Sequence, residues 1–233
     1  MGIKREIALL HAVTKIHKMR VRQSERIIRA AIEKCPSWYI AFSGGKDSTV
    51  IAALVRKFLP GVPLVWSDDE WYLPETEEYM RRMENLHHIR TNDWHAEWFQ
   101  VSGDWNGIPD YGHAQGWEGA FLGLRQGESS QRRLHLRRYG TLYYAENNQQ
   151  WQCNPISDWD WKDVWAYIFS NELDYNHAYD RLDEIGIEPE RQRIGPFAVE
   201  CVLGYGQLAI LKRGWPELFN RFAAEFPEVR CYV

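Results

Sequence analysis

The chain has 233 residues, which is long enough to bury the core of one α/β domain of ordinary size. Apolar residues make up 45% of the sequence and charged residues 26%, and this balance excludes a disordered tail or a fibrous protein. The 28 lysines and arginines stand against 32 aspartates and glutamates. The net charge of -4 therefore excludes attachment to nucleic acid through bulk positive charge, and leaves a local basic patch open.

The apolar runs and the cysteines of the sequence indicate the cellular compartment of the protein. No run approaches the roughly 20 apolar residues of a membrane-spanning helix, and the N-terminal residues are too charged for a signal peptide. The four cysteines are widely spaced and include no C-x-x-C pair, which argues against a zinc ribbon or a disulfide framework. We therefore expect a cytoplasmic protein with no membrane partner.

The hydrophobic pattern predicts alternating strands and helices. The predicted elements, in chain order, are two helices within residues 4–34 that break near 19–24, a strand at 38–42, a helix at 48–59, a strand at 62–66, a helix at 74–84, a strand at 87–91, an ordered loop at 93–118, a strand at 119–124, a hairpin of 139–144 and 150–153, a helix at 160–170, and one or two helices within 206–226.

This order predicts an α/β fold with a mostly parallel central sheet and helices on both faces, which is a three-layer α/β/α arrangement. No internal repeat, low-complexity tract or linker interrupts the chain, so we expect a single domain. Within it, N-terminal helices occupy residues 1–35, a nucleotide-binding core 36–180, and a helical C-terminal extension 181–233.

The sharpest motif is Ser-Gly-Gly-Lys-Asp-Ser-Thr at residues 43–49, directly between a predicted strand and a predicted helix. Two glycines let backbone N–H groups turn toward an anion, and the following helix offers its unpaired N–H groups and its dipole to the same anion. A lysine adds positive charge and three hydroxyls add donors. The predicted phosphate-binding residues here are Ser43, Gly44, Gly45, Lys46, Asp47, Ser48 and Thr49.

Asp47 is the unusual member, because a carboxylate beside phosphates repels them. Its presence is explained if it holds a divalent metal, which we expect to be Mg²⁺, or if it fixes the N–H groups of the loop. The spacing differs from both the G-x-x-x-x-G-K-[ST] loop and the G-x-G-x-x-G fingerprint. The motif resembles the pyrophosphate loop of the adenine nucleotide α-hydrolase superfamily. That resemblance implies binding of ATP or a related adenylyl compound, often with cleavage between its α- and β-phosphates.

Three later segments narrow the resemblance to the phosphoadenosine phosphosulfate (PAPS) reductase family. Residues 68–76 are similar to a D-T-G-[aromatic]-x-F-P-E-T segment, and Asp68 aligns with its first residue. Residues 123–133 are similar to G-x-R-x-x-[DE]-S-x-x-R. Residues 154–168 look like P-[IL]-x-x-W-x-x-x-D-V-W-x-Y-I. The resemblance implies that Asp68 and Gly123 line the nucleotide site, that Arg125 grips a phosphate or sulfate, and that Arg132 or Arg133 contacts a second anion.

The third segment also predicts local structure. We interpret Trp159 and Trp165 as core residues, and expect Asp158 or Asp160 near the start of a helix.

The sequence departs from the family at its redox residues. The E-C-G-L-H segment that carries the nucleophilic cysteine of the reductases is absent, and Pro196 stands where relatives have a cysteine of an iron–sulfur cluster. We therefore expect no such cluster. Cys231, three residues from the end, is a candidate nucleophile on a tail, and Cys201 is a weaker one. Cys35 and Cys153 are interpreted as structural.

Three functions follow as hypotheses. The first is an enzyme that binds ATP with Mg²⁺ and activates an acceptor by adenylyl transfer, with Lys46, Asp47 and Arg125 as catalytic residues. The second is thioredoxin-dependent reduction of a sulfonucleotide by Cys231. The third is a nucleotide-binding subunit of a larger complex without chemistry of its own. The basic stretch 132–138 is interpreted as serving the nucleotide phosphates or a solvated face, with nucleic acid left open, and a homo-oligomer is also left open.

Overall fold

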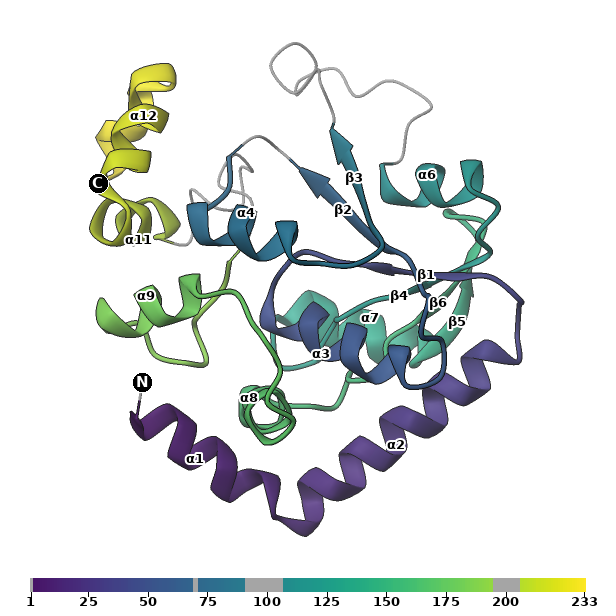
Figure 1. Ribbon diagram of the computed structural model, residues 1–233. Helices are drawn as coiled ribbons and strands as arrows, with labels where there is room; N and C mark the ends of the chain where they lie inside the picture. The colour runs from purple at the N-terminus through teal and green to yellow at the C-terminus, as the bar shows by residue number, and fades with distance from the viewer. Residues whose placement is uncertain (1, 69–70, 91–106, 195–205) are drawn as a thin grey trace.

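A six-stranded sheet forms the centre of the computed structural model, which describes residues 2–68, 71–90, 107–194 and 206–233 (Figure 1). The strand order is β3-β2-β1-β4-β6-β5. Each strand is parallel to its neighbours except β5, which pairs antiparallel with β6. The strands are β1 (Trp38–Ala41), β2 (Leu64–Asp68), β3 (Leu86–Arg90), β4 (Gly119–Phe121), β5 (Leu142–Ala145) and β6 (Gln150–Cys153).

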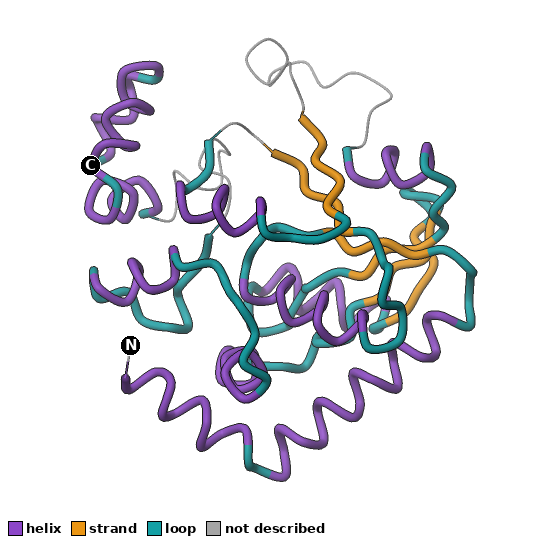
Figure 2. Tube along the Cα trace, in the orientation of Figure 1, coloured by secondary structure: helices purple, strands orange, loops and turns teal. Residues whose placement is uncertain are grey.

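Helices surround this sheet, as the tube view shows (Figure 2). They are α1 (Gly2–Ala12), α2 (Lys15–Ile32), α3 (Lys46–Arg56), α4 (Pro74–Arg81), α6 (Ile108–Ala114), α7 (Ser130–Tyr139), α8 (Trp161–Ser170), α9 (Ala178–Glu184), α11 (Gln207–Gly214) and α12 (Pro216–Glu225), followed by the 3₁₀ helix η1 (Pro227–Tyr232). In the part of the chain that the structure describes, none of these helices is both long and apolar enough to cross a bilayer.

Both faces of the sheet are covered, because alternate residues of the central strands β1, β2 and β4 enter different hydrophobic clusters. Trp38 and Ile40 of β1 belong to the larger cluster, whereas Tyr39 between them joins a smaller one. The smaller cluster is closed by residues of α6, and Figure 1 shows α6 on the side of the sheet away from α3. The prediction of a mostly parallel α/β fold is therefore confirmed.

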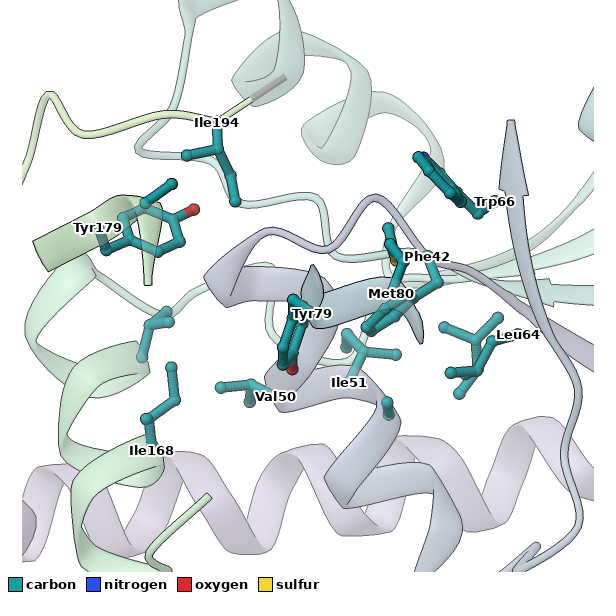
Figure 3. Close-up of a cluster of buried hydrophobic side chains, with 14 of the residues drawn as sticks. Phe42, Val50, Ile51, Leu64, Trp66, Tyr79, Met80, Ile168, Tyr179 and Ile194 are labelled. Carbon is teal, nitrogen blue, oxygen red and sulfur yellow. The ribbon is translucent and has the colours of Figure 1, made fainter. Parts of the chain in front are cut away.

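The larger cluster joins the central strands to α3, α4 and α8. Figure 3 shows Phe42, Ile51, Leu64 and Met80 gathered in this cluster. Trp159 and Trp165 are only 1% and 0% exposed, which confirms their interpretation as core residues. The indole Nε1 of Trp159 donates to Ser24 Oγ at 3.0 Å.

The break between the first two helices was predicted near residues 19–24, and this prediction is wrong. The two helices are separated at Val13 and Thr14, where the Thr14 hydroxyl accepts a hydrogen bond from the backbone N–H of His17 and caps α2. Arg20 and Ser24, two polar residues of this stretch, make specific contacts within one continuous helix. Ser24, for example, is buried and donates to the carbonyl of Pro155 at 2.7 Å.

Only the end of the loop predicted for residues 93–118 can be compared with the structure, because residues 91–106 lie outside the described part. In that end the prediction of a loop is wrong. Ile108–Ala114 form α6, with Pro109 in its first turn. Gly112 allows close packing here, because a Cβ at this position would lie 2.7 Å from the ring of Tyr39. Glycines and aromatic residues obscure the helical period of this short segment.

Two local predictions in the second half are confirmed. β5 and β6 form the predicted hairpin, although β5 starts at Leu142 because α7 extends to Tyr139. Of the two aspartates expected near the next helix, Asp160 is its N-cap, and its side chain accepts the backbone N–H groups of Lys162 and Asp163.

The described end of the C-terminal extension is helical, as expected, and α11 and α12 dock on the core next to α4. Trp215 Nε1 lies 3.0 and 2.9 Å from the two carboxylate oxygens of Glu75. Trp71, which precedes α4, packs edge-on against Phe222 of α12 at 5.0 Å between ring centroids.

We expect Gly119→Ala to lower the free energy of unfolding by about 1–3 kcal/mol, which is the usual cost of overpacking a core. The added Cβ would lie 2.6 Å from atoms of the Trp38 ring, between two central strands. Gly61→Ala is the matched control, because its Cβ would meet no atom within 4 Å. Urea denaturation of both variants measures the difference, and an equal loss in the two would contradict the packing argument.

Candidate functional site

The turn between β1 and α3 is shaped by its two buried glycines. Gly44 has a φ of +70°, a left-handed backbone conformation that residues other than glycine adopt only with strain. Gly45 is the N-cap of α3 and carries no side chain to occupy the end of the helix. The turn therefore brings the positive end of α3 to the carboxyl edge of the sheet, where ligands of open α/β folds bind.

Lys46, the first residue of α3, is buried with only 3% of its surface exposed. Its Nζ donates to the backbone carbonyl of Gln192 at 2.9 Å and lies 3.6 Å from Asp47 Oδ2. Burial lowers the pKa of the Lys46 ammonium, and the positive charges of Arg125 and Arg193 lower it further against the opposing effect of Asp47. The amine is thus held among charged groups, with a neutral carbonyl as its main partner.

The backbone N–H of Lys46 is also bound. It donates to the hydroxyl of Tyr179 at 3.0 Å, and this tyrosine reaches the turn from α9. Burial raises the pKa of the Tyr179 phenol, which keeps it neutral. Figure 3 shows Tyr179 and Ile194 close together, and a Cβ on Gly45 would lie within 4 Å of both.

Asp47 lies between two cations. Its Oδ1 accepts a hydrogen bond from Arg125 Nε, and its Oδ2 faces Lys46. Burial favours the protonated acid, but Lys46 and Arg125 outweigh burial and hold the pKa of Asp47 below its ordinary value. Neither of the two roles considered from the sequence, a metal ligand or a partner of loop N–H groups, matches these contacts. Asp47 instead aligns the two cations.

Residues after β4 complete this arrangement. Gly123 passes so close to the start of α3 that a Cβ there would lie 3.1 Å from the Asp47 carbonyl carbon and 3.2 Å from the Ser48 nitrogen. Arg125 is 5% exposed, and its backbone N–H donates to Glu128 Oε2 at 3.0 Å. The sequence placed both residues in the site, and the fold brings both to the turn.

Glu128 joins further arginines to the cluster. Arg132, on the first turn of α7, pairs with Glu128 Oε2, and Arg193 Nη1 lies 3.1 Å from Oε1. Arg133 is exposed, and its guanidinium lies 3.5 Å from Ser130 Oγ instead. Of the two arginines left open by the sequence, the fold therefore brings Arg132 to the cluster.

The three hydroxyls of the motif have different roles. Ser48 and Thr49 donate back to the carbonyl of Gly45 at 2.9 and 3.0 Å, so they brace the turn. Ser43 is exposed, and its Oγ lies 3.3 Å from Ser48 Oγ. Ser43 is thus the hydroxyl of the motif that faces solvent.

Asp68 ends β2, at the same edge of the sheet as the turn, because β1 and β2 are parallel. Its side chain lies outside the described part, as does Cys201. Cys231 is exposed on η1, and Figure 1 shows the C-terminus well away from the start of α3. Cys35 and Cys153 are buried, as interpreted; burial raises the pKa of Cys35 to about 11 and raises that of Cys153 further.

Sequence reasoning missed Tyr179, Gln192, Glu128 and Arg193. The sequence carried a signal for two of them: Glu128 occupies the acidic position of the 123–133 motif, and Arg193 precedes the segment that contains Pro196. Their partners lie far away in sequence, which is why no local pattern identifies them.

Comparisons with known proteins identify the family and the fold. The sequence profile of the phosphoadenosine phosphosulfate reductase domain matches residues 37–101 and 112–197. The chain is 24% identical to the phosphoadenosine 5'-phosphosulfate reductase of Xylella fastidiosa, over 73% of this chain and 84% of that protein. It is also 24% identical to the uncharacterized protein MJ0973 of Methanocaldococcus jannaschii, over 89% of this chain and 53% of that protein. The chain thus spans about half the length of this second relative.

Solved structures share the fold. The phosphoadenylyl-sulfate reductase of Candida auris, a phosphate complex, superposes with a TM-score of 0.55 at 21% identity, over 76% of this chain and 89% of that one. The FMN adenylyltransferase of Candida glabrata with FMN and an ATP analogue gives 0.55 at 10% identity, over 76% and 67%. At these identities the likeness concerns the fold alone. The profile match covers more than half of the sequence, and the chain therefore belongs to the phosphoadenosine phosphosulfate reductase domain family, a family of enzymes.

Proposed function

We propose that the chain binds an adenine nucleotide at the β1–α3 turn and acts at its α-phosphate, transferring the adenylyl group of ATP to an acceptor with release of pyrophosphate. The observation that carries the proposal is the charge at the start of α3. Four cationic side chains meet two carboxylates there, with Asp47 and Glu128 as the anions and Lys46, Arg125, Arg132 and Arg193 as the cations. The surplus positive charge and the helix N-terminus suit a polyphosphate.

The contacts of Lys46 support binding of an anion. A phosphate oxygen is a stronger acceptor for an ammonium than the neutral Gln192 carbonyl that holds Nζ at 2.9 Å. Asp47 keeps Arg125 pointed at the same region. In-line displacement at phosphorus needs positioning and charge neutralisation more than a protein nucleophile, and these two cations supply both.

A Mg²⁺ ion at Asp47 does not fit these contacts, since both carboxylate oxygens already face cations. We therefore assign no step to a metal bound by Asp47.

Two solved structures with a similar fold support a nucleotide as the ligand. Candida glabrata FMN adenylyltransferase was crystallised with ATP, and also with FAD and inorganic pyrophosphate. The reductase of Candida auris is a phosphate complex. This chain has the fold of both, so we extend nucleotide binding to it as part of the proposal.

The first test replaces the lysine of the turn. Lys46→Ala should reduce pyrophosphate release from ATP on the order of 100-fold, the usual effect of removing one group that stabilises transition-state charge. Lys57→Ala is the control, because Lys57 is the C-cap of the same helix and pairs with Glu25 at the surface. Release of labelled pyrophosphate with a panel of acceptors gives the readout. Equal activity in Lys46→Ala and wild type would refute the proposal, and tight ATP binding without turnover by wild type would favour a binding subunit.

The second test probes the close approach of Gly123. Gly123→Ala should weaken ATP binding at least about tenfold, equal to about 1.4 kcal/mol, because the methyl group would push on the backbone of Asp47 and Ser48. Gly127→Ala in the same loop should leave affinity unchanged, since its Cβ meets no atom within 4 Å. Calorimetric titration with ATP measures both. Similar affinities for the two variants would count against binding at this turn.

Reduction of a sulfonucleotide is the second candidate, favoured by the reductase names of relatives and by the exposed Cys231 thiol. Under this candidate, Cys231→Ser should abolish thioredoxin-dependent sulfite release from PAPS, because the serine hydroxyl cannot accept the sulfur. Sulfite release is measured for wild type and variant side by side, with Cys35→Ser as a buried-cysteine control. Undiminished release by Cys231→Ser would exclude this mechanism.

A further inference from the structure

A second cluster of metal-ligating side chains lies away from the β1–α3 turn, where α1, α2 and α8 meet. His11 lies in the last turn of α1, His17 near the start of α2, and Asp163 in the first turn of α8. His11 Nε2 and His17 Nδ1 lie 2.9 and 3.0 Å from the same oxygen, Asp163 Oδ1. All three potential ligand atoms fall within 4.8 Å of one another.

The other carboxylate oxygen is already engaged. Asp163 Oδ2 accepts from the guanidinium of Arg20 and, at 3.1 Å, from the backbone N–H of Asp160. These contacts orient the carboxylate without using Oδ1. Ligating carboxylates are commonly held in this way by hydrogen bonds from a surrounding shell. Arg20 does not add an uncompensated charge, since it also lies 3.3 Å from Asp160 Oδ2.

Burial and access suit a bound ion. The side chains of Asp163 and His17 are 0% and 4% exposed, whereas that of His11 is 16% exposed. Two of the three side chains are thus buried, and His11 is the one that reaches solvent. Two imidazole nitrogens and one carboxylate oxygen are a ligand set of Zn²⁺ sites that keep a fourth position for water.

We propose that His11, His17 and Asp163 bind a divalent transition-metal ion, with Zn²⁺ as the natural occupant and water as its fourth ligand. The ion replaces the two hydrogen bonds that now converge on Oδ1. Because its ligands come from three helices, it fastens α1 and α2 to α8. This site is separate from the nucleotide site in its residues, and it does not depend on the proposed reaction.

The alternative is a hydrogen-bonded cluster in which both imidazoles donate to Oδ1 without any ion. Two substitutions separate the alternatives while conserving that cluster. In His11→Gln the side-chain amide N–H can replace Nε2–H, and in His17→Asn it can replace Nδ1–H. Each keeps a donor for Asp163 but removes a nitrogen ligand. His113→Gln is the matched control, because His113 is exposed on α6 and contacts the carbonyl of Asn148.

The experiment uses the full chain without a histidine tag, in a Cys231→Ser background that removes the thiol exposed in the described part of the chain. Co²⁺ titration followed by visible absorption reports a low-coordinate metal with nitrogen and oxygen ligands, and Zn²⁺ competition gives its affinity. Wild type and His113→Gln should bind one Co²⁺ per chain. His11→Gln and His17→Asn should each bind at least about tenfold more weakly, since even loss of an outer-shell partner costs about 10–100-fold.

Thermal unfolding gives a second readout. Zn²⁺ should raise the unfolding temperature of wild type and His113→Gln, and a chelator should reverse the rise, because an ion that binds only the folded chain stabilises it. In His11→Gln and His17→Asn the rise should be lost while the metal-free unfolding temperature stays near that of wild type. Absence of a Co²⁺ spectrum in wild type, or an unchanged spectrum in both variants, would overturn the proposal.

Discussion

The candidate site depends on the partly buried carboxylate of Asp47 and its ion pairs. This carboxylate lies against Lys46 and Arg125, two cations that would otherwise repel each other inside the protein. The same contacts keep Asp47 ionised, since its pKa lies below the ordinary value. One negative charge thereby holds two positive charges at the N-terminus of α3, where an anionic ligand can share them.

Segments far apart in sequence close around this charge arrangement. The backbone carbonyl of Gln192 accepts a hydrogen bond from Lys46 Nζ, and the side-chain amide of Gln192 donates one to Asp183. Lys4 of α1 is also buried beside this pair, 2.7 Å from Asp183 Oδ2. α1 therefore contributes indirectly to the position of the lysine at the turn.

The fold by itself does not choose the reaction. The family includes proteins named as reductases, and the same fold serves an FMN adenylyltransferase. In this chain Arg193 pairs with Glu128 beside the β1–α3 turn, which adds a guanidinium group to the site.

The sequence by itself determined the strand–turn–helix around residues 43–49, the order of the central strands and helices, and the family. Those features depend on residues close together in the chain: apolar runs, paired glycines and hydroxyls at a helix start. Only the tertiary structure decided that Arg132 rather than Arg133 joins the cluster, that Tyr179 and Gln192 hold Lys46, and that the first helices break at Thr14. Tyr179 and Gln192 lie 133 and 146 residues from Lys46, and contacts of that separation leave no periodic trace in a single sequence.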